Sequence, residues 1–483
     1  MEEDYRNLCQ VFTPIKNVKE LLDWCGYKHE LYGKKIIENS CGDGNILKEV
    51  VKRYIDDCIQ KGFTNSEISK GLENDIYAIE YDEQQFEKCK TNLNKILEQY
   101  GFSKLKWKNL KNDDTLKSIY KEKFDYVVGN PPYIKYKSLS IEDREYIRKN
   151  YITCKNGKFD YCYAFIENSI KSLKNSGKMA YLIPSSIFKN VFANDLRNFI
   201  KPHIIKIYDY TVTKLFDKNT NVKGTDRLVS SVIMILEKNS DNNYLEYIDI
   251  NKNETIIIDK KDLDDKWIFR NRIKDIENKI KFGEFFLASN TIATLYNDGF
   301  VIKEYIEDDN FIYPPIGGKI EKKVVKDTIS PKSFSKEKVE KIIFPYYYNK
   351  NNDLVRYDTQ EFEREFPNTC EYLKKFEKKL QNRKSDKNAK WFEYGRSQAL
   401  KNSNNEKLLL STVITDRVKT KILPKDNIPY SGIYIIPIKD KTLKEAEEIL
   451  KSKEFFEYIE GKGINASGNS LRITAKDINE YMF

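Results

Sequence analysis

The first half of the chain alternates short apolar runs with longer amphipathic segments. Apolar runs cover residues 35–38, 75–81, 124–129, 177–183, 204–208 and 229–236, and a helical pattern fills residues 83–100. Strand–helix alternation at this spacing is typical of parallel strands joined by crossover helices. We therefore expect an α/β fold with a doubly wound parallel sheet and helices on both faces.

The alternation ends near residue 240. Residues 241–283 are polar and charged, and the segments beyond them mix short β-like runs, such as 342–348, with basic helices, such as 371–383. A chain of 483 residues is also too long for one ordinary domain. We predict an α/β domain over 1–240, a connector over 241–283 and a mixed α+β domain over 284–483.

Composition excludes several classes of protein. No stretch of 18 apolar residues occurs and the first ten residues are polar, so we expect no membrane segment, no secretory signal and a cytoplasmic protein. The eight cysteines form no C-x-x-C pair, and there are only two histidines. These counts argue against a disulfide framework and against a metal site. The chemistry should need little proton relay.

The net charge of +10 is concentrated late in the chain. Residues 371–430 contain 15 Lys and Arg against 7 Asp and Glu. Such a density is typical of proteins that bind a polyanion, although a solvated lysine-rich surface has the same composition. Our candidate contacts to nucleic acid in this region are Lys384, Arg396, Arg417 and Lys419.

Three short motifs carry groups suited to a nucleotide-like ligand. Residues 38–44 read E-N-S-C-G-D-G, and their two glycines allow close approach of the backbone to a ligand. Glu80 ends the second strand, where a carboxylate commonly binds ribose hydroxyls. In N-D-D-T-L, residues 112–116, a carboxylate can accept a hydrogen bond from an adenine amino group. Each feature alone is more typical of a turn, a strand end or a helix cap.

The most specific motif is N-P-P-Y at residues 130–133, directly after the apolar strand F-D-Y-V-V-G. Pro131 and Pro132 fix two φ angles and remove two backbone donors, so the loop is rigid. The side-chain oxygen of Asn130 and the carbonyl of Pro131 can both accept from one planar amino group, which frees its lone pair for attack. Tyr133 offers a face for stacking the attacked ring. We predict these four residues as catalytic.

Taken in order, these motifs resemble the amino-adenine (N6) DNA methyltransferases of restriction–modification systems, most nearly their TaqI-like gamma class. The resemblance includes Q-V-F-T-P at residues 10–14 and G-K-M-A-Y-L-I-P-S-S at residues 177–186, and it covers roughly the first half of the chain. It implies a Rossmann-like class I methyltransferase domain that uses S-adenosylmethionine. It also implies a C-terminal target-recognition domain that binds double-stranded DNA.

The resemblance assigns roles to individual residues. It implies that Thr13, Glu38, Ser40 and Cys41 line the methionine end of the cofactor, with Asn39, Gly42 and Asn130 beside them. Glu80 would hold the ribose, and Asp113 or Asp114 would hold the cofactor's adenine, on which Pro132 packs. Asn130 and Pro131 would activate the target amine. Tyr133 and Phe216 would hold the target base by stacking.

Such an enzyme would methylate an adenine rotated out of the duplex. It would serve as the modification enzyme of a restriction–modification system, beside a separate cognate endonuclease, or as an orphan methylase, in a prokaryote or a phage. Three alternatives stay open. The chain could methylate RNA or protein glutamine with the same N-P-P-Y chemistry, it could be an inactive DNA-binding specificity module, or its target could be cytosine N4.

Overall fold

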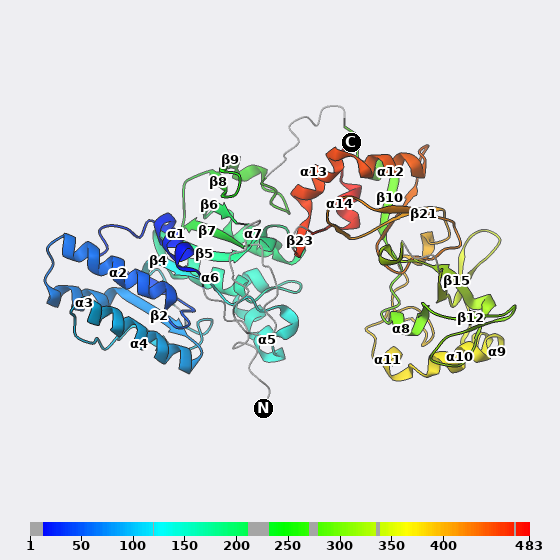
Figure 1. Cartoon of the computed structure of the whole chain (residues 1–483), viewed down its shortest axis with the longest axis horizontal. Helices are drawn as coiled ribbons and strands as arrows, with labels where there is room; N and C mark the ends of the chain where they lie inside the picture. The colour runs from blue at the N-terminus through cyan, green and yellow to red at the C-terminus, as the bar shows by residue number, and fades with distance from the viewer. Residues whose placement is uncertain (1–12, 119, 211–230, 270–278, 335–338, 468–469) are drawn as a thin grey trace. The chain divides into compact units, whose positions relative to one another are not determined.

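The computed structural model describes residues 13–118, 120–210, 231–269, 279–334, 339–467 and 470–483. The chain divides into two compact units, Met1–Arg272 and Ile273–Phe483 (Figure 1). Among the described residues, no helix is long and apolar enough to cross a membrane.

The first unit is built on a nine-stranded sheet with the order β3-β2-β1-β4-β5-β7-β6-β8-β9. Strands β1 to β5 run parallel, and β7 runs antiparallel to both of its neighbours, β5 and β6. β8 pairs parallel with β6 and antiparallel with β9. The strand bounds are β1 (Ile36–Glu38), β2 (Ile76–Glu80), β3 (Leu110–Asn112), β4 (Phe124–Gly129), β5 (Leu173–Pro184), β6 (Ile204–Asp209), β7 (Ser231–Glu237), β8 (Tyr244–Asp249) and β9 (Glu254–Asp259).

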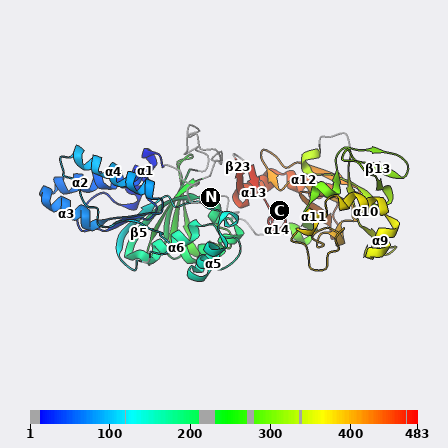
Figure 2. The ribbon, with the colours of Figure 1, turned by 90° about the horizontal axis from the view of Figure 1, so that it is seen from below.

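Helices cover both faces of this sheet. In Figure 2, α1, α2 and α4 lie on one side of it and α5 and α6 on the other. Successive residues along each strand point to opposite faces of the sheet, so each face has its own apolar cluster. The helices are α1 (Ile15–Cys25), α2 (Asn45–Gln60), α3 (Asn65–Asp75), α4 (Glu83–Gln99), α5 (Ile141–Asn150), α6 (Cys162–Ser172) and α7 (Asn194–Ile200).

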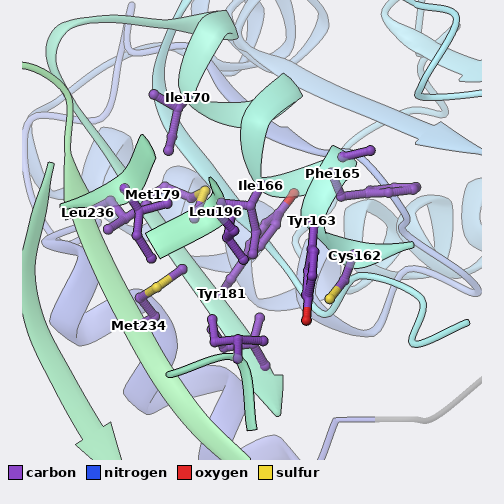
Figure 3. Close-up of a cluster of buried hydrophobic side chains, with 14 of the residues drawn as sticks. Cys162, Tyr163, Phe165, Ile166, Ile170, Met179, Tyr181, Leu196, Met234 and Leu236 are labelled. Atoms are coloured by element: carbon purple, nitrogen blue, oxygen red, sulfur yellow. The ribbon is translucent and has the colours of Figure 1, made fainter. Parts of the chain in front are cut away.

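The central strand β5 shows why the sequence forms this layered core. Met179 and Tyr181 belong to the cluster beneath α6, whereas Ala180 and Leu182 belong to the cluster beneath α1 and α2. Figure 3 shows part of the first cluster, with Ile166 and Ile170 of α6 grouped with side chains of β5 and β7. A strand buried on both faces reads as a continuous apolar run, which is why the run at 177–183 was recognisable.

The winding of the sheet changes direction between β1 and β4. From β1 the chain moves outward through β2 to β3, and it then returns to β4 on the other side of β1. The loops that follow β1 and β4 therefore diverge, and a crevice opens at their carboxyl ends, which is where open α/β sheets bind ligands. Glu38 pairs with Val128 across this point, so the loop at Asn130 starts two residues farther along β4.

The expected α/β fold is confirmed, but the first unit extends past residue 240. Residues 241–283, which we expected to form a connector, contribute β8 and β9 to the sheet. In β8, Leu245 and Tyr247 are buried while Tyr244 is exposed and Glu246 is half-buried. Because these strands at the end of the sheet are only half-buried, polar residues alternate with apolar ones in β8. The segment therefore has no continuous apolar run.

The second unit contains several small antiparallel sheets. Its largest sheet has the order β10-β22-β19-β21, and a cluster with α12, α13 and α14 packs on it. A second cluster joins the smaller sheets to α9 and α10. The strands are β10 (Phe286–Asn290), β11 (Val301–Ile302), β12 (Ile306–Glu307), β13 (Phe311–Tyr313), β14 (Ile320–Glu321), β15 (Val325–Thr328), β16 (Glu340–Ile343), β17 (Tyr346–Tyr348), β18 (Leu354–Arg356), β19 (Lys407–Leu410), β20 (Val413–Ile414), β21 (Thr420–Leu423), β22 (Ile433–Pro437), β23 (Ile464–Ser467) and β24 (Ser470–Arg472).

Two elements that the sequence suggested in this unit are each divided. The run 342–348 forms β16 and β17 in different sheets, because Pro345 between them has no N–H for a ladder. The basic segment 371–383 forms the end of one helix and a second, separate helix. The helices are α8 (Asn297–Phe300), α9 (Thr359–Glu365), α10 (Pro367–Lys374), α11 (Glu377–Gln381), α12 (Leu443–Lys451), α13 (Lys453–Lys462) and α14 (Ala475–Asn479).

Candidate active site

A pocket of about 1020 Å³, including its open mouth, lies at the carboxyl ends of β1, β2 and β4. Most of the predicted site residues line it together: Thr13, Glu38, Asn39, Ser40, Cys41, Gly42, Glu80, Asp114, Asn130, Pro131, Pro132 and Tyr133. Segments distant in sequence meet here because parallel strands end at the same edge of a sheet.

The loop between β1 and α2 depends on its two glycines. Gly42 and Gly44 have φ values of 53° and 84°, a region that other residues rarely adopt. A Cβ on Gly44 would also lie 2.7 Å from Sγ of Cys89 on α4. Gly44 therefore allows α4 to pack directly against the loop. The Sγ atoms of Cys41 and Cys89 are 3.8 Å apart, and this hydrogen bond and burial raise the pKa of the Cys41 thiol.

Three pocket residues hold buried acceptor atoms that lack a partner. Glu38 is only 3% exposed, and burial raises the pKa of its carboxyl well above its usual value. Its Oε2, together with Oδ1 of Asp43 and Oε1 of Gln85, has no hydrogen-bond partner within the described part of the chain. Unpaired buried acceptors are costly, so they indicate a ligand that brings several donors.

The carboxylate of Glu80 joins two loops of the pocket. Its Oε2 accepts from the backbone N–H of Gly42 at 2.7 Å, and its Oε1 accepts from that of Asp82 at 2.9 Å. The backbone of Tyr81 forms a third hydrogen bond with this carboxylate, which has about four acceptor sites, so it can still accept from a ligand. Burial raises the pKa of this carboxyl as well.

Of the two neighbouring aspartates after β3, only Asp114 lines the pocket. Asp113 instead accepts hydrogen bonds from N–H of Asp114 and from the hydroxyl of Ser118, at 2.8 and 2.6 Å. The structure thus separates two residues that the sequence motif could not distinguish.

Asn39 has an internal role in addition to its position at the pocket. Its Nδ2 donates to Oγ of Ser169 at 2.9 Å, and its Oδ1 accepts from the hydroxyl of Tyr181. These bonds attach the end of β1 to α6 and β5. The side-chain polar atoms of Asn39 are therefore already paired, unlike Oε2 of Glu38.

Asn130 is oriented by the segment that precedes α1. Its Nδ2 donates to Oγ1 of Thr13 at 3.3 Å, and its backbone oxygen accepts from the hydroxyl of Ser40 at 3.4 Å. With Nδ2 directed to Thr13, the acceptor Oδ1 lies on the other side of the amide, near the hydroxyl of Tyr133. The loop after β4 is thus tied to the loop after β1 across the crevice.

The hydroxyl of Tyr133 lies 2.5 Å from both Oδ1 of Asn130 and the carbonyl oxygen of Leu182. Burial raises the pKa of this tyrosine well above its usual value, so the hydroxyl keeps its proton. One proton can be donated to only one of the two oxygens at a time. When Leu182 accepts it, Oδ1 of Asn130 can accept a bond from another donor.

Sequence reasoning missed several residues of the pocket. Tyr161 and Phe165, one turn apart at the start of α6, line it with ring centroids 5.3 Å apart. The i, i+4 aromatic spacing was a signal, but in a helix it usually means core. Other lining residues that we did not predict are Asp43, Asn45, Ile46, Tyr81, Asp82, Gln85, Thr115 and Ile134. Phe216 lies outside the described residues.

The candidate contacts in the second unit differ in their surroundings. Arg396 forms an ion pair with Asp386 at 2.7 Å. Lys384, Arg417 and Lys419 are exposed, and none has a carboxylate partner within the described ranges. Tyr394, in the same region, is buried and donates to the carbonyl of Ile343, so it belongs to the core.

Comparison with known proteins agrees with this geometry. Residues 28–216 match the model of the Eco57I restriction-modification methylase family. The Type II methyltransferase M.BstVI of Geobacillus stearothermophilus is 32% identical over 213 residues, which cover 41% of this chain and 37% of that protein. The Type II restriction enzyme and methyltransferase RM.Eco57I of Escherichia coli is 25% identical over 344 residues, 62% of this chain and 33% of that protein. The chain thus spans little more than a third of the length of these relatives.

Solved structures resemble a larger part of the chain. The Type IIL restriction-modification enzyme MmeI, solved in complex with DNA, matches 96% of this chain and 64% of its own with a TM-score of 0.58 and 15% identity. The Type ISP restriction-modification enzyme LlaGI matches 89% of this chain and 42% of its own with a TM-score of 0.54 and 14% identity. The fold of this chain is therefore similar to that of these two enzymes. Residues 28–216 are thus similar to the methylase domain that the Eco57I restriction-modification methylase family describes.

Proposed function

We propose that the chain is a site-specific DNA methyltransferase that transfers a methyl group from S-adenosylmethionine to N6 of an adenine in double-stranded DNA. The carrying observation is that the N-P-P-Y loop shares one pocket with the strand-end carboxylates Glu38 and Glu80. An amine-activating loop and a nucleoside-binding edge therefore meet in one crevice. The family match of residues 28–216 supports the same reaction.

The donor and acceptor set of the pocket fits this cofactor. The unpaired Oε2 of Glu38 suits an ammonium group, which carries donors only, and Glu80 has lone pairs for ribose hydroxyls. Asp114 and Pro132 line the same pocket, and we assign them to the cofactor's adenine, with Asp114 accepting from its amino group and Pro132 packing on its ring. S-adenosylmethionine would supply an electrophilic methyl group on a good leaving group. The protein would mainly need to align the reactants and exclude water.

The Asn130 loop activates the amine through two acceptors. Thr13 holds the amide so that Oδ1 stays an acceptor, and Pro131 adds its backbone carbonyl from a rigid loop. Two hydrogen bonds from one planar amine draw its lone pair out of conjugation with the ring. When the amine arrives, the hydroxyl of Tyr133 can turn its hydrogen bond from Oδ1 of Asn130 to the carbonyl of Leu182, so Oδ1 becomes available and the hydroxyl keeps an acceptor.

Double-stranded DNA is the substrate that best explains the second unit. An adenine inside a duplex cannot reach the pocket and has to be rotated out of the stack. Lys384, Arg417 and Lys419 are exposed and have no ion pair with the part of the chain that the structure describes, so they are suited to phosphate contacts, which position a protein on DNA. The names of the relatives support a place in a restriction–modification system, where a cognate endonuclease would cut the same sequence when it is unmethylated.

The test is methyl transfer to unmethylated genomic DNA, with the product nucleoside identified by mass spectrometry. We expect N6-methyladenine from the wild type and a rate at least about 100-fold lower from Asn130→Ala, with unchanged cofactor affinity. Asn65→Ala, an exposed asparagine at the start of α3, is the matched control and should keep full activity. N4-methylcytosine would change the assigned base. No transfer to DNA by a wild type that binds the cofactor would overturn the proposal and direct the assay to RNA and glutamine peptides.

A further inference from the structure

The segment between the N-P-P-Y loop and α6 carries an unusual excess of positive charge. Residues 134–159 contain seven Lys and Arg against three Asp and Glu. The exposed members are Lys135, Lys137, Arg148, Lys149, Lys155 and Lys158, which we call the basic surface. It comprises the turn η2 (Tyr136–Ser138), α5 and the loop that leads to α6.

Most of these cations lack a carboxylate partner. Lys135 pairs with Asp160 at 2.6 Å, but the other five members have no ion pair with any described residue. Elsewhere in the first unit some exposed lysines are paired, as in Lys61–Glu30 and Lys104–Glu98, whereas others, such as Lys34 and Lys70, have no ion pair with a described residue. Charges that the protein itself leaves uncompensated are those available to an external anion.

The basic surface is held in shape by contacts within it. One guanidinium nitrogen of Arg148 donates to the hydroxyl of Tyr136 at 3.1 Å and to the carbonyl of Gly157 at 2.8 Å. The guanidinium groups of Arg144 and Arg148 lie 4.6 and 5.2 Å from the ring centroid of Tyr136. A surface ordered in advance loses less conformational entropy when it binds a partner.

An apolar loop lies beside the basic surface. Val191 and Phe192 are 63% and 42% exposed, although they follow the buried strand β5 closely. The ring of Phe192 lies on Gly157, where a Cβ would be 2.4 Å from its Cδ1. Asn156 donates to the carboxylate of Asp195 at 2.9 Å, which joins the two loops a second time.

A buried arginine forms hydrogen bonds with the backbone next to this apolar loop. Arg197 is 1% exposed, and its guanidinium donates to the carbonyls of Ile187 and Asn190, both at 2.7 Å. The loop is therefore fixed by internal bonds while it keeps two large apolar side chains in solvent. Exposed apolar side chains on a rigid loop are typical of a contact surface.

The basic surface begins where the pocket ends. Ile134 and Tyr161 both line the pocket, and the N–H of Tyr161 donates to the carbonyl of Ile134 at 2.9 Å. Lys135 and Asp160 come next on each strand of this pairing. The loop with Phe192 follows β5, which pairs with β4 up to Gly129 and so ends at the same edge of the sheet.

We propose that the basic surface and Phe192 bind the DNA duplex beside the extruded base, with Lys137, Lys155 and Lys158 on backbone phosphates and Phe192 against the stacked bases. The inference rests on the proposed function and extends it to the catalytic unit. Positive charge favours phosphates, and an apolar side chain beside a vacated stack offers a contact that water cannot replace. A second set of contacts would then hold the duplex close to the pocket itself.

The test compares two triple variants of the full chain with equal loss of charge. One is Lys137→Ala/Lys155→Ala/Lys158→Ala. The control is Lys34→Ala/Lys70→Ala/Lys95→Ala, which removes exposed lysines without a carboxylate partner in the described ranges, from the segment before β1, from α3 and from α4. The probe is a 30-base-pair duplex that contains the sequence methylated by the wild type. Its Kd is measured between 50 and 200 mM salt, together with the Kd for S-adenosylmethionine.

We expect the first variant to bind the duplex at least about tenfold more weakly and to lose about 0.9 from the slope of log K against log salt for each lost contact. Cofactor affinity should not change, and the control should retain the wild-type slope. Phe192→Ala should raise the KM for this duplex about fivefold, whereas Phe192→Leu should raise it less. Equal slopes for both triple variants, in a wild type that does methylate DNA, would overturn this inference alone. A wild type without transfer to DNA would overturn the proposed function first.

Discussion

Glu38 combines deep burial with a free acceptor atom at the pocket. Its carboxyl has a raised pKa because it is desolvated, and its Oε2 has no partner in the described structure. Only the ionised form attracts an ammonium group. We predict that affinity for S-adenosylmethionine falls as pH decreases through this raised pKa, and that the fall begins at a higher pH than an ordinary glutamate would cause. Calorimetric titration across pH 5 to 8 measures it.

Glu38→Gln is the variant that isolates the charge. It should bind the cofactor more weakly at high pH and show little change in affinity on acidification. Glu83→Gln alters an exposed carboxylate at the start of α4 and should leave the wild-type profile intact. If Glu38→Gln kept the full pH dependence, another group would be responsible and the ammonium assignment would be wrong.

Thr13 orients the side-chain amide of Asn130. Its Oγ1 accepts from Nδ2 of Asn130, so removing this acceptor should let the amide rotate. We predict that Thr13→Val lowers the single-turnover rate at saturating cofactor about fivefold, the worth of one hydrogen bond. Thr13→Ser keeps the hydroxyl and should remain near the wild-type rate. Equal loss in both variants would show that the methyl group, not the hydrogen bond, matters.

The turn from β1 into α2 should be highly sensitive to a single substitution. Gly44→Ala would place a Cβ at φ 84° and 2.7 Å from Sγ of Cys89. The backbone strain costs about 1–2 kcal/mol and the crowding about 1–3 kcal/mol more. We predict a clear loss of stability in thermal unfolding, together with weaker cofactor binding because Gly42 in the same loop donates to Glu80.

Gly62→Ala separates strain from crowding. Gly62 follows α2 with φ 80°, but a Cβ there would meet no atom within 4 Å. It should show only the backbone cost and leave cofactor affinity unchanged. Adding Cys89→Ala to Gly44→Ala should recover the part of the unfolding free energy that is lost to crowding. A double-mutant cycle measures that coupling. A cycle with zero coupling would contradict the close approach of α4.

At the scale of elements, prediction from sequence worked where one strand or one loop carries the signal. Strands buried on both faces, such as β5 and β7, appear as apolar runs, and the residues of the Asn130 loop are contiguous in the chain. It failed where the role depends on a partner distant in sequence. The internal bonds of Asn39 to α6 and β5, and the choice of Asp114 over Asp113 at the pocket, follow from packing that no local pattern encodes. β8 and β9, at one end of the sheet, gave no continuous apolar run because their residues are only partly buried.

At the scale of the whole molecule, each unit has apolar clusters of its own. The first contains the two layers around the nine-stranded sheet, and the second contains those around its small sheets. Domains with separate cores can generally fold alone. The cofactor pocket is lined entirely by residues of the first unit, whereas the candidate contacts Lys384, Arg417 and Lys419 belong to the second.

Because the pocket and the candidate DNA contacts of the second unit belong to different units, we can predict how the first unit behaves by itself. A fragment of residues 1–272 should unfold cooperatively and bind S-adenosylmethionine within about threefold of the affinity of the full chain, because its pocket is complete. It should no longer prefer the DNA sequence that the full chain methylates. It should keep only weak, salt-sensitive DNA binding through Lys137, Lys155 and Lys158. Specific and non-specific binding differ by at least about 1000-fold, so competition with a mutated duplex resolves the two cases. A fragment that still discriminated its sequence would place base recognition in the catalytic unit, and the second unit would then need another role.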